Sequence, residues 1–368
     1  MSKLLTIVSI LLVAIVVVLY LLPNKTEYVR EDTTVFSDEP DVLIIPPLAE
    51  RVGQLIAIGH WTDTSPEFTA DLVSKLGIGS VIIMQTPPLD TTISDWTKNW
   101  QIAASGTPLL ISIDQEGGVV SRLKGEEYIQ TAQPDIVDTA TAYAIASKRA
   151  EELISLGINA NYAPVVDQSE SPASFMYQRV FRDSTMIGAL ANAMVRGYQN
   201  NDVLAVPKHY PGHPDTSDDS HLELPVLDIS VTEYIDHTKQ FSELIAAGNT
   251  KILMTAHVLV PAVDSEYPAT LSPAVLNDLR ERIGFQGVII TDDLAMKAVS
   301  NKWSHEEAAI LALQAGADMI MLSSRPEYAA GTITAIMEAV QSGSLSEARI
   351  NEAYKRVMSL KQEMEKKD

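Results

Sequence analysis

Short apolar runs recur along the chain, and helical patterns lie between them. Several runs are apolar throughout and rich in Val and Ile, which is typical of strands buried on both faces of a parallel sheet. In one of the intervening helices, Ser272 suits the N-cap, Pro273 the first turn and Gly284 the end. The eight predicted strands are 54–59, 80–84, 108–114, 158–167, 203–210, 251–258, 287–294 and 318–324.

Eight strand–helix units in succession predict an α/β fold in which the strands close into a (β/α)8 barrel, the TIM barrel. A doubly wound open sheet is the alternative. It is disfavoured because no glycine-rich dinucleotide fingerprint follows an early strand. We expect the barrel to occupy residues 44–366.

The N-terminus has a different pattern. Residues 4–22 carry no charge and are long enough to span a bilayer as a helix. No small-x-small cleavage site follows them, so we predict an uncleaved anchor over 1–22 rather than a cleaved signal peptide. Residues 23–43 are polar and acidic and read as a linker. Positive charges are nearly balanced across the segment, and we adopt a single-pass orientation in the cell membrane with the barrel outside the cytoplasm.

The amino-acid composition excludes several classes of function. Apolar residues make up 46% of the chain and charged residues 20%, as in a globular protein. The formal charge of −21 argues against nucleic acid as a partner. The absence of cysteine excludes disulfides, thiolate metal sites and a cysteine nucleophile.

Ionisable side chains stand at the ends of most predicted strands. Each alone would also suit a cap for the following helix. In a barrel, however, the carboxyl ends of the strands meet on one rim, where catalytic residues lie. We therefore expect a polar pocket there. The residues are Asp114, Asp167, Lys208, His209, His257, Asp292 and Asp293.

The stretch "KHYPGHPDTSDDSHLELP" concentrates His and Asp after the fifth strand. His209, His213, His221 and Asp219 offer metal ligands, but the helical His-Glu-x-x-His pattern is absent and prolines interrupt the segment. We therefore predict no metal. Asp219 and His221 are two residues apart and share one side of an extended segment, which suits proton transfer near neutral pH. A solvated polar loop is the alternative.

A candidate nucleophile comes from another strand. Asp292 directly follows the apolar "GVIIT". A carboxylate at that position can attack an anomeric carbon and form a glycosyl-enzyme. A helix cap is the alternative for this residue taken alone.

Three motifs in this order resemble the glycoside hydrolase family 3 β-N-acetylglucosaminidases. They are "DQEGGVVSRL", "KHYPGHPDTSDDSHLELP" and "GVIITDDLAM", and the resemblance extends over roughly residues 50–365. It implies a retaining mechanism on a barrel, with Asp292 as nucleophile and His221 as general acid/base working with Asp219. It also implies residues that bind the terminal sugar or shape its pocket: Asp114, Arg122, Arg179, Lys208, His209, His213, His257 and Met296.

Two departures from the family pattern concern the aglycone side. Pro214 stands where the family usually has Gly, and "QRVF" around Arg179 replaces the usual Gly-x-Arg-Ser-Phe. These departures bear on the identity of the substrate more than on the type of reaction.

The resemblance implies an exo-β-N-acetylhexosaminidase that releases terminal β-linked N-acetylglucosamine from peptidoglycan or related glycans. It needs no cofactor, and we expect a monomer bound to the membrane by its N-terminal helix. Two alternatives stay open: another family 3 β-glycosidase or a glycoside phosphorylase, and an inactive barrel that binds the cell wall.

Overall fold

The computed structural model describes residues 46–86, 90–215, 220 and 222–365. These residues belong to one compact unit that begins at Pro46. The predicted anchor (4–22) and linker (23–43) lie outside them. Among the described residues, no helix combines the length and the apolar character needed to cross a bilayer.

The core is a parallel sheet of eight strands, ordered β7-β6-β3-β2-β1-β10-β9-β8, in which the first strand of the chain, β1, pairs with both β2 and the last strand, β10. Past the end of β7, the N–H of Tyr210 donates to the carbonyl of Met254 in β8 at 2.9 Å. This contact joins the two ends of the sheet, so the predicted barrel is confirmed and the open doubly wound sheet is wrong. The strands are β1 (Ile56–His60), β2 (Ser80–Ile83), β3 (Leu110–Ile113), β6 (Ala160–Asn161), β7 (Leu204–Ala205), β8 (Ile252–Met254), β9 (Val288–Asp293) and β10 (Met319–Leu322).

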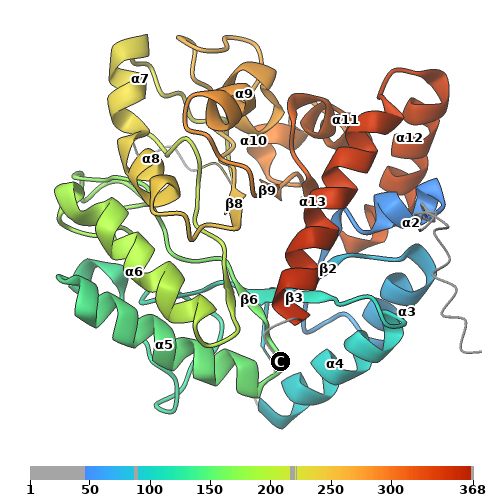
Figure 1. Ribbon diagram of the computed structural model, residues 1–368, viewed down its shortest axis with the longest axis horizontal. Coiled ribbons are helices and arrows are strands. Elements are labelled where there is room, and N and C mark those ends of the chain that lie inside the picture. Colours follow the sequence, from blue (N-terminus) through green and yellow to red (C-terminus); the bar gives the residue numbers. More distant parts are fainter. Residues whose placement is uncertain (1–45, 87–89, 216–219, 221, 366–368) are drawn as a thin grey trace, which may run out of the picture. The chain divides into compact units, whose positions relative to one another are not determined.

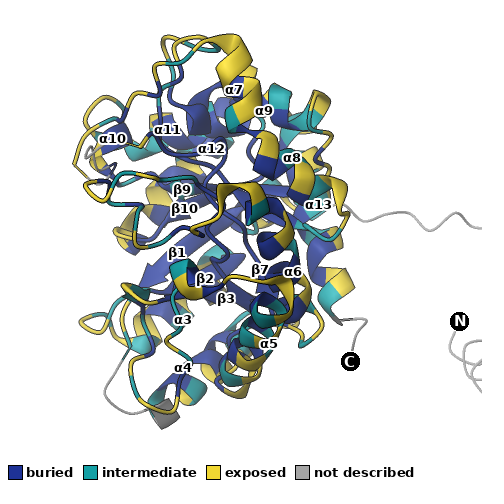
Figure 2. Ribbon diagram, turned by 90° about the vertical axis from the view of Figure 1, so that its left-hand side faces the viewer, coloured by how far each residue is buried: buried dark blue, intermediate teal, exposed yellow. Residues whose placement is uncertain are grey.

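Helices follow the strands and cover the barrel (Figure 1). Their inward faces are buried with the strands, and their outer faces carry most of the exposed residues (Figure 2). This arrangement explains why the strands are apolar on both faces. The helices are α2 (Leu48–Gly53), α3 (Pro66–Leu76), α4 (Asp90–Ala103), α5 (Thr139–Ser155), α6 (Ile187–Gln199), α7 (Val231–His237), α8 (Lys239–Ala246), α9 (Pro273–Glu281), α10 (Lys297–Ser300), α11 (His305–Ala315), α12 (Ala329–Ser342) and α13 (Glu347–Glu365).

Helix α9 begins as the sequence predicts. The Ser272 hydroxyl accepts a hydrogen bond from the N–H of Val275 at 3.2 Å, and Pro273 is the first helical residue. The last helical residue is Glu281, and Gly284 follows with a φ of +82°. The predicted N-cap and first turn are therefore confirmed.

A short antiparallel hairpin follows β3 and was not predicted. It consists of β4 (Gln115–Gly117) and β5 (Val120–Ser121). Gly117 and Gly118 turn the chain with φ values of +92° and +62°, which favour glycine. A Cβ on Gly117 would lie 2.1 Å from the carbonyl oxygen of Thr131, so no larger residue fits. The hairpin brings Glu116, Val119 and Val120 of the "DQEGGVVSRL" motif to the rim of the barrel.

Candidate active site

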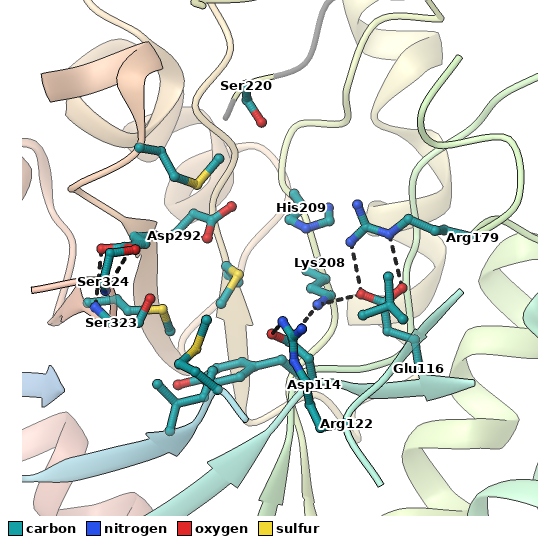
Figure 3. Close-up of a pocket in the computed structure, with 18 of the residues that line it drawn as sticks. Asp114, Glu116, Arg122, Arg179, Lys208, His209, Ser220, Asp292, Ser323 and Ser324 are labelled. Carbon is teal, nitrogen blue, oxygen red and sulfur yellow. Dashed lines mark hydrogen bonds and ion pairs between the residues drawn. The ribbon is translucent and has the colours of Figure 1, made fainter. Parts of the chain in front are cut away.

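A pocket of about 310 Å³ opens among the carboxyl ends of the strands and the loops that follow them. Figure 3 shows Asp292 on one side of it and a group of charged residues on the other. Nine of the residues predicted for the pocket line it: Asp114, Arg122, Arg179, Lys208, His209, His213, Asp292, Asp293 and Met296.

Opposite charges alternate along the wall that faces Asp292. The Lys208 ammonium donates to Asp114 Oδ1 at 2.6 Å and forms an ion pair with Glu116 Oε1 at 2.7 Å. Arg122 binds the second oxygen of Asp114 at 3.2 Å. Arg179 binds both oxygens of Glu116, at 2.8 and 3.0 Å. Each cation in this wall is paired with a carboxylate of the same wall, which suits these cations to bind a neutral polar ligand.

These pairs keep the groups charged despite their burial. Burial works to raise the pKa of Asp114, but Lys208 and Arg122 outweigh it and hold that pKa well below its usual range. Burial likewise works to lower the pKa of Lys208, and the carboxylates of Asp114 and Glu116 raise it overall. Both groups therefore carry full charge at neutral pH.

The two adjacent carboxylates at the end of β9 differ in their hydrogen bonds. Asp293 accepts from the N–H groups of Ala295 and Ser323, both at 3.1 Å, and from the N–H (3.0 Å) and hydroxyl of Ser324. Asp292 accepts from the N–H of Asp293 at 2.8 Å and points into the pocket (Figure 3). Of these two carboxylates, Asp292 is thus the one with lone pairs left to react.

The pKa of Asp292 also favours a nucleophile. Burial works to raise it, but the rings of His257 and His209, the N–H of Asp293 and the Lys208 ammonium together lower it. Asp292 is therefore an anion at neutral pH, as a carboxylate nucleophile must be.

Asp167 holds the start of the loop that contains His209 and His213. Its carboxylate accepts from the N–H of His209 at 3.0 Å, from Nδ1 of the same ring at 2.8 Å, and from the N–H of His213 at 2.7 Å. With Nδ1 of His209 thus engaged, Nε2 is the ring nitrogen left for a ligand. Burial lowers the pKa of His213 to about 3, so that ring is neutral.

The same three residues are the group, among those described, that could hold a metal ion. The ligand atoms of Asp167, His209 and His213 lie within 4.8 Å of one another. Hydrogen bonds among these residues already account for that closeness. The predicted absence of a metal stays a prediction.

His257, which the resemblance places along the site, is fully buried and lies outside the pocket lining. Its Nε2–H donates to the carbonyl of Asp293 at 2.9 Å, and its Nδ1 pairs with the Thr270 hydroxyl at 2.9 Å. It therefore contacts the main chain next to Asp292 from outside the pocket lining.

Other lining residues were not identified from the sequence. Glu116 is among them, as are Trp61 and three further methionines that give the pocket an apolar side: Met84, Met254 and Met321. The Gly-Gly pair after Glu116 is a hairpin signal that could have placed this carboxylate at the rim. Trp61 follows the His60 strand end and donates its indole N–H to the carbonyl of Ser323 at 2.8 Å.

The predicted acid/base pair, Asp219 and His221, lies outside the described residues. Ser220, between them in the chain, lines the pocket. Its carbonyl accepts from the N–H of Ala298 at 3.3 Å.

Known proteins similar to this chain include two that are named beta-hexosaminidases. The chain is 31% identical over 343 residues to beta-hexosaminidase A of Pseudoalteromonas piscicida, an alignment that covers 81% of this chain and 55% of that protein. It is 30% identical over 330 residues to beta-hexosaminidase LpqI of Mycobacterium tuberculosis, covering 85% of this chain and 82% of that one.

A similar structure is that of a glycoside hydrolase family 3 beta-N-acetylglucosaminidase from Paenibacillus sp. str. FPU-7. The TM-score is 0.82 at 34% identity, and the match covers 88% of this chain and 64% of that one. The chain thus spans just over half of the Pseudoalteromonas protein and under two thirds of the Paenibacillus chain. The family model described as the glycosyl hydrolase family 3 N terminal domain matches residues 47–360. With that match over nearly all of the described barrel, the chain belongs to glycosyl hydrolase family 3.

Proposed function

We propose that the chain is a retaining exo-β-N-acetylhexosaminidase that removes terminal β-linked N-acetylglucosamine from peptidoglycan or related glycans. One observation carries the proposal: Asp292, a carboxylate with free lone pairs, faces the paired cations of Lys208 and Arg179 across a pocket of about 310 Å³. The relatives named as hexosaminidases support the choice of sugar.

In this reaction the charged wall orients the sugar. Lys208, Arg122 and Arg179 donate to its hydroxyl or amide oxygens, while Asp114 accepts from a hydroxyl. Because these groups are held by one another before the sugar arrives, little reorganisation accompanies binding. Asp292 then attacks the anomeric carbon as the glycosidic bond breaks, and a covalent glycosyl-enzyme forms.

We assign the proton transfers to His221, oriented by Asp219. The imidazolium protonates the departing oxygen, and the neutral ring then removes a proton from the water that releases the sugar. The basis is the resemblance of the motif to the family. In addition, Ser220, which lies between Asp219 and His221 in the sequence, lines the pocket. Two displacements at the same carbon retain its configuration.

The uncharged stretch 4–22 supports a further part of the proposal, a single-pass membrane anchor with the barrel outside the cytoplasm. We also propose that the protein acts as a monomer without a cofactor. Removal of residues 1–43 should yield protein that stays out of the membrane fraction and keeps its specific activity. Membrane association that persists without this segment would contradict the anchor.

The direct test uses 4-nitrophenyl N-acetyl-β-glucosaminide and the matching glucoside, each with and without phosphate. We expect hydrolysis of the N-acetylglucosaminide, and NMR should show the β-anomer of the sugar first. Faster turnover with phosphate and release of a sugar 1-phosphate would identify a phosphorylase. No turnover of either substrate, with N-acetylglucosamine still bound, would identify an inactive sugar-binding barrel.

A further inference from the structure

Glu116 is a buried carboxylate with no role in the mechanism above. It lies in β4, next to the Gly-Gly turn of the hairpin, and its side chain is 1% exposed. Burial works to raise its pKa, but Arg179 and Lys208 lower it overall, so the group is an anion. A charge so far removed from solvent is costly unless it is fully paired, and its partners show what it does.

Its partners come from two separate parts of the chain. Oε1 is shared between Arg179, at 2.8 Å, and the Lys208 ammonium, at 2.7 Å, and Oε2 accepts from Nε of Arg179 at 3.0 Å. Arg179 precedes α6, and Lys208 follows β7. Figure 3 shows the carboxylate between the two cations. Glu116 therefore fixes both side chains relative to each other.

This pairing also decides which donors are left for a sugar. Lys208 has three N–H bonds: one donates to Asp114 Oδ1, and the ammonium also forms an ion pair with Glu116 Oε1 at 2.7 Å. Arg179 uses Nε and Nη2 on Glu116, and its Nη1 lies 3.5 Å from the sulfur of Met176. Without Glu116, Arg179 would lose its carboxylate partner, and Lys208 would keep Asp114 alone.

Glu116 also neutralises Arg179. Among the described residues, Glu116 is the carboxylate that forms an ion pair with Arg179, at 2.8 Å. Replacing Glu116 by a neutral residue leaves the Arg179 guanidinium without a carboxylate partner at a buried position that lines the pocket. An unpaired guanidinium attracts a small anion, which competes with an uncharged sugar.

We propose that Glu116 is a positioning residue: it directs the free donors of Lys208 and Arg179 at the sugar and makes the pocket selective for neutral sugars over anions. The inference rests on the proposed function. Because Glu116 acts through two other side chains, its loss should affect the chemical step and the response to anions, and not only stability.

The test compares Glu116→Gln and Glu116→Ala with Asp318→Asn as a matched control. Asp318 is also a fully buried carboxylate, bound to Arg280, Arg349 and Arg356 at 2.7, 2.6 and 3.1 Å. It precedes β10, at the opposite end of the strands from the pocket, and does not line it. The control therefore removes a comparable ion-pair network without touching the proposed site.

For Glu116→Gln we expect kcat/KM on 4-nitrophenyl N-acetyl-β-glucosaminide to fall about 100-fold, the usual effect of a misplaced sugar. Formate and phosphate should inhibit this variant at concentrations that leave the wild type unaffected. For Glu116→Ala, formate should restore activity saturably, because it can occupy the vacated space between the two cations. Asp318→Asn should lower Tm but keep kcat/KM, with no effect of formate.

Two results would overturn the inference: folded Glu116→Gln with wild-type kinetics and no anion inhibition, or a loss in Asp318→Asn equal to that in Glu116→Gln. If Glu116→Ala does not fold, the anion inhibition of Glu116→Gln decides the matter. If the wild type turns over no substrate, the proposed function fails. Calorimetry with N-acetylglucosamine then tests the inference separately, since Glu116→Gln should still bind the sugar more weakly than the wild type.

Discussion

The neighbouring carboxylates Asp292 and Asp293 should respond oppositely to the same substitution. Asp293 accepts four hydrogen bonds, from three N–H groups and the Ser324 hydroxyl. A carboxamide has one acceptor oxygen, so Asp293→Asn leaves about two of these donors facing an NH2 group. At about 1.5 to 3 kcal/mol for each hydrogen bond to a charged group, we expect a loss of about 3 kcal/mol or more in the free energy of unfolding.

Asp292→Asn removes much less hydrogen bonding than Asp293→Asn. The N–H of Asp293 donates to Asp292 Oδ1 at 2.8 Å, and a carboxamide oxygen can accept the same bond. The change also removes a charge whose burial is unfavourable. We therefore expect the stability of Asp292→Asn to equal that of the wild type within about 1 kcal/mol, while turnover falls by about 10⁴-fold or more because the nucleophile is lost.

Denaturant and thermal unfolding followed by fluorescence, together with hydrolysis of 4-nitrophenyl N-acetyl-β-glucosaminide, separate the two effects. Asp293→Asn should lower Tm by on the order of 5 °C and keep measurable activity. Asp292→Asn should keep its Tm and lose activity. If Asp292→Asn were as destabilised as Asp293→Asn and still active, the assignment of the nucleophile would be refuted.

Three further predictions follow from buried groups. Burial lowers the pKa of Lys361 to about 7, below its unfolded value. The unfolded chain therefore binds more protons between about pH 7 and 10, and stability rises with pH across that window. In denaturant titrations, Lys361→Met should flatten the rise of the free energy of unfolding with pH, and the exposed Lys355→Met should not. An unchanged rise in Lys361→Met contradicts the reasoning. Asp167→Asn should lower kcat/KM about 100-fold through misplacement of His209, and wild-type kinetics would exclude that role. His257→Gln should lower kcat about 10-fold or more with little change in KM, since His257 supports the main chain behind Asp292; a change in KM alone would argue against this.

The barrel could be predicted because strands buried on both faces leave a direct record in the sequence. Each of the eight apolar runs overlaps one strand of the sheet. The same logic located the pocket, since strand ends meet on one rim. Asp114, Lys208, His209 and Asp292 lie there because the apolar residues before them fix where each strand stops.

Residues that depend on contacts between distant segments were harder to predict. Glu116 enters the site because the chain reverses at Gly117, and a polar residue beside two glycines also suits an exposed turn. His257 ends an apolar run as Lys208 does, but its hydrogen bonds to Thr270 and Asp293 direct it away from the pocket. The difference between Asp292 and Asp293 depends on N–H groups that follow β10, about thirty residues further along the chain.

The most direct test of the account is to trap the intermediate that Asp292 is proposed to form. A 5-fluoro N-acetylglucosaminyl fluoride should react with the protein because the ring fluorine slows both steps while fluoride leaves readily. Mass spectrometry of the intact protein should show one added sugar, and peptide mapping should place it on Asp292, with no adduct in Asp292→Asn. An adduct on Asp293 or elsewhere, or turnover of this substrate through Asp292→Asn at the wild-type rate, would contradict the account.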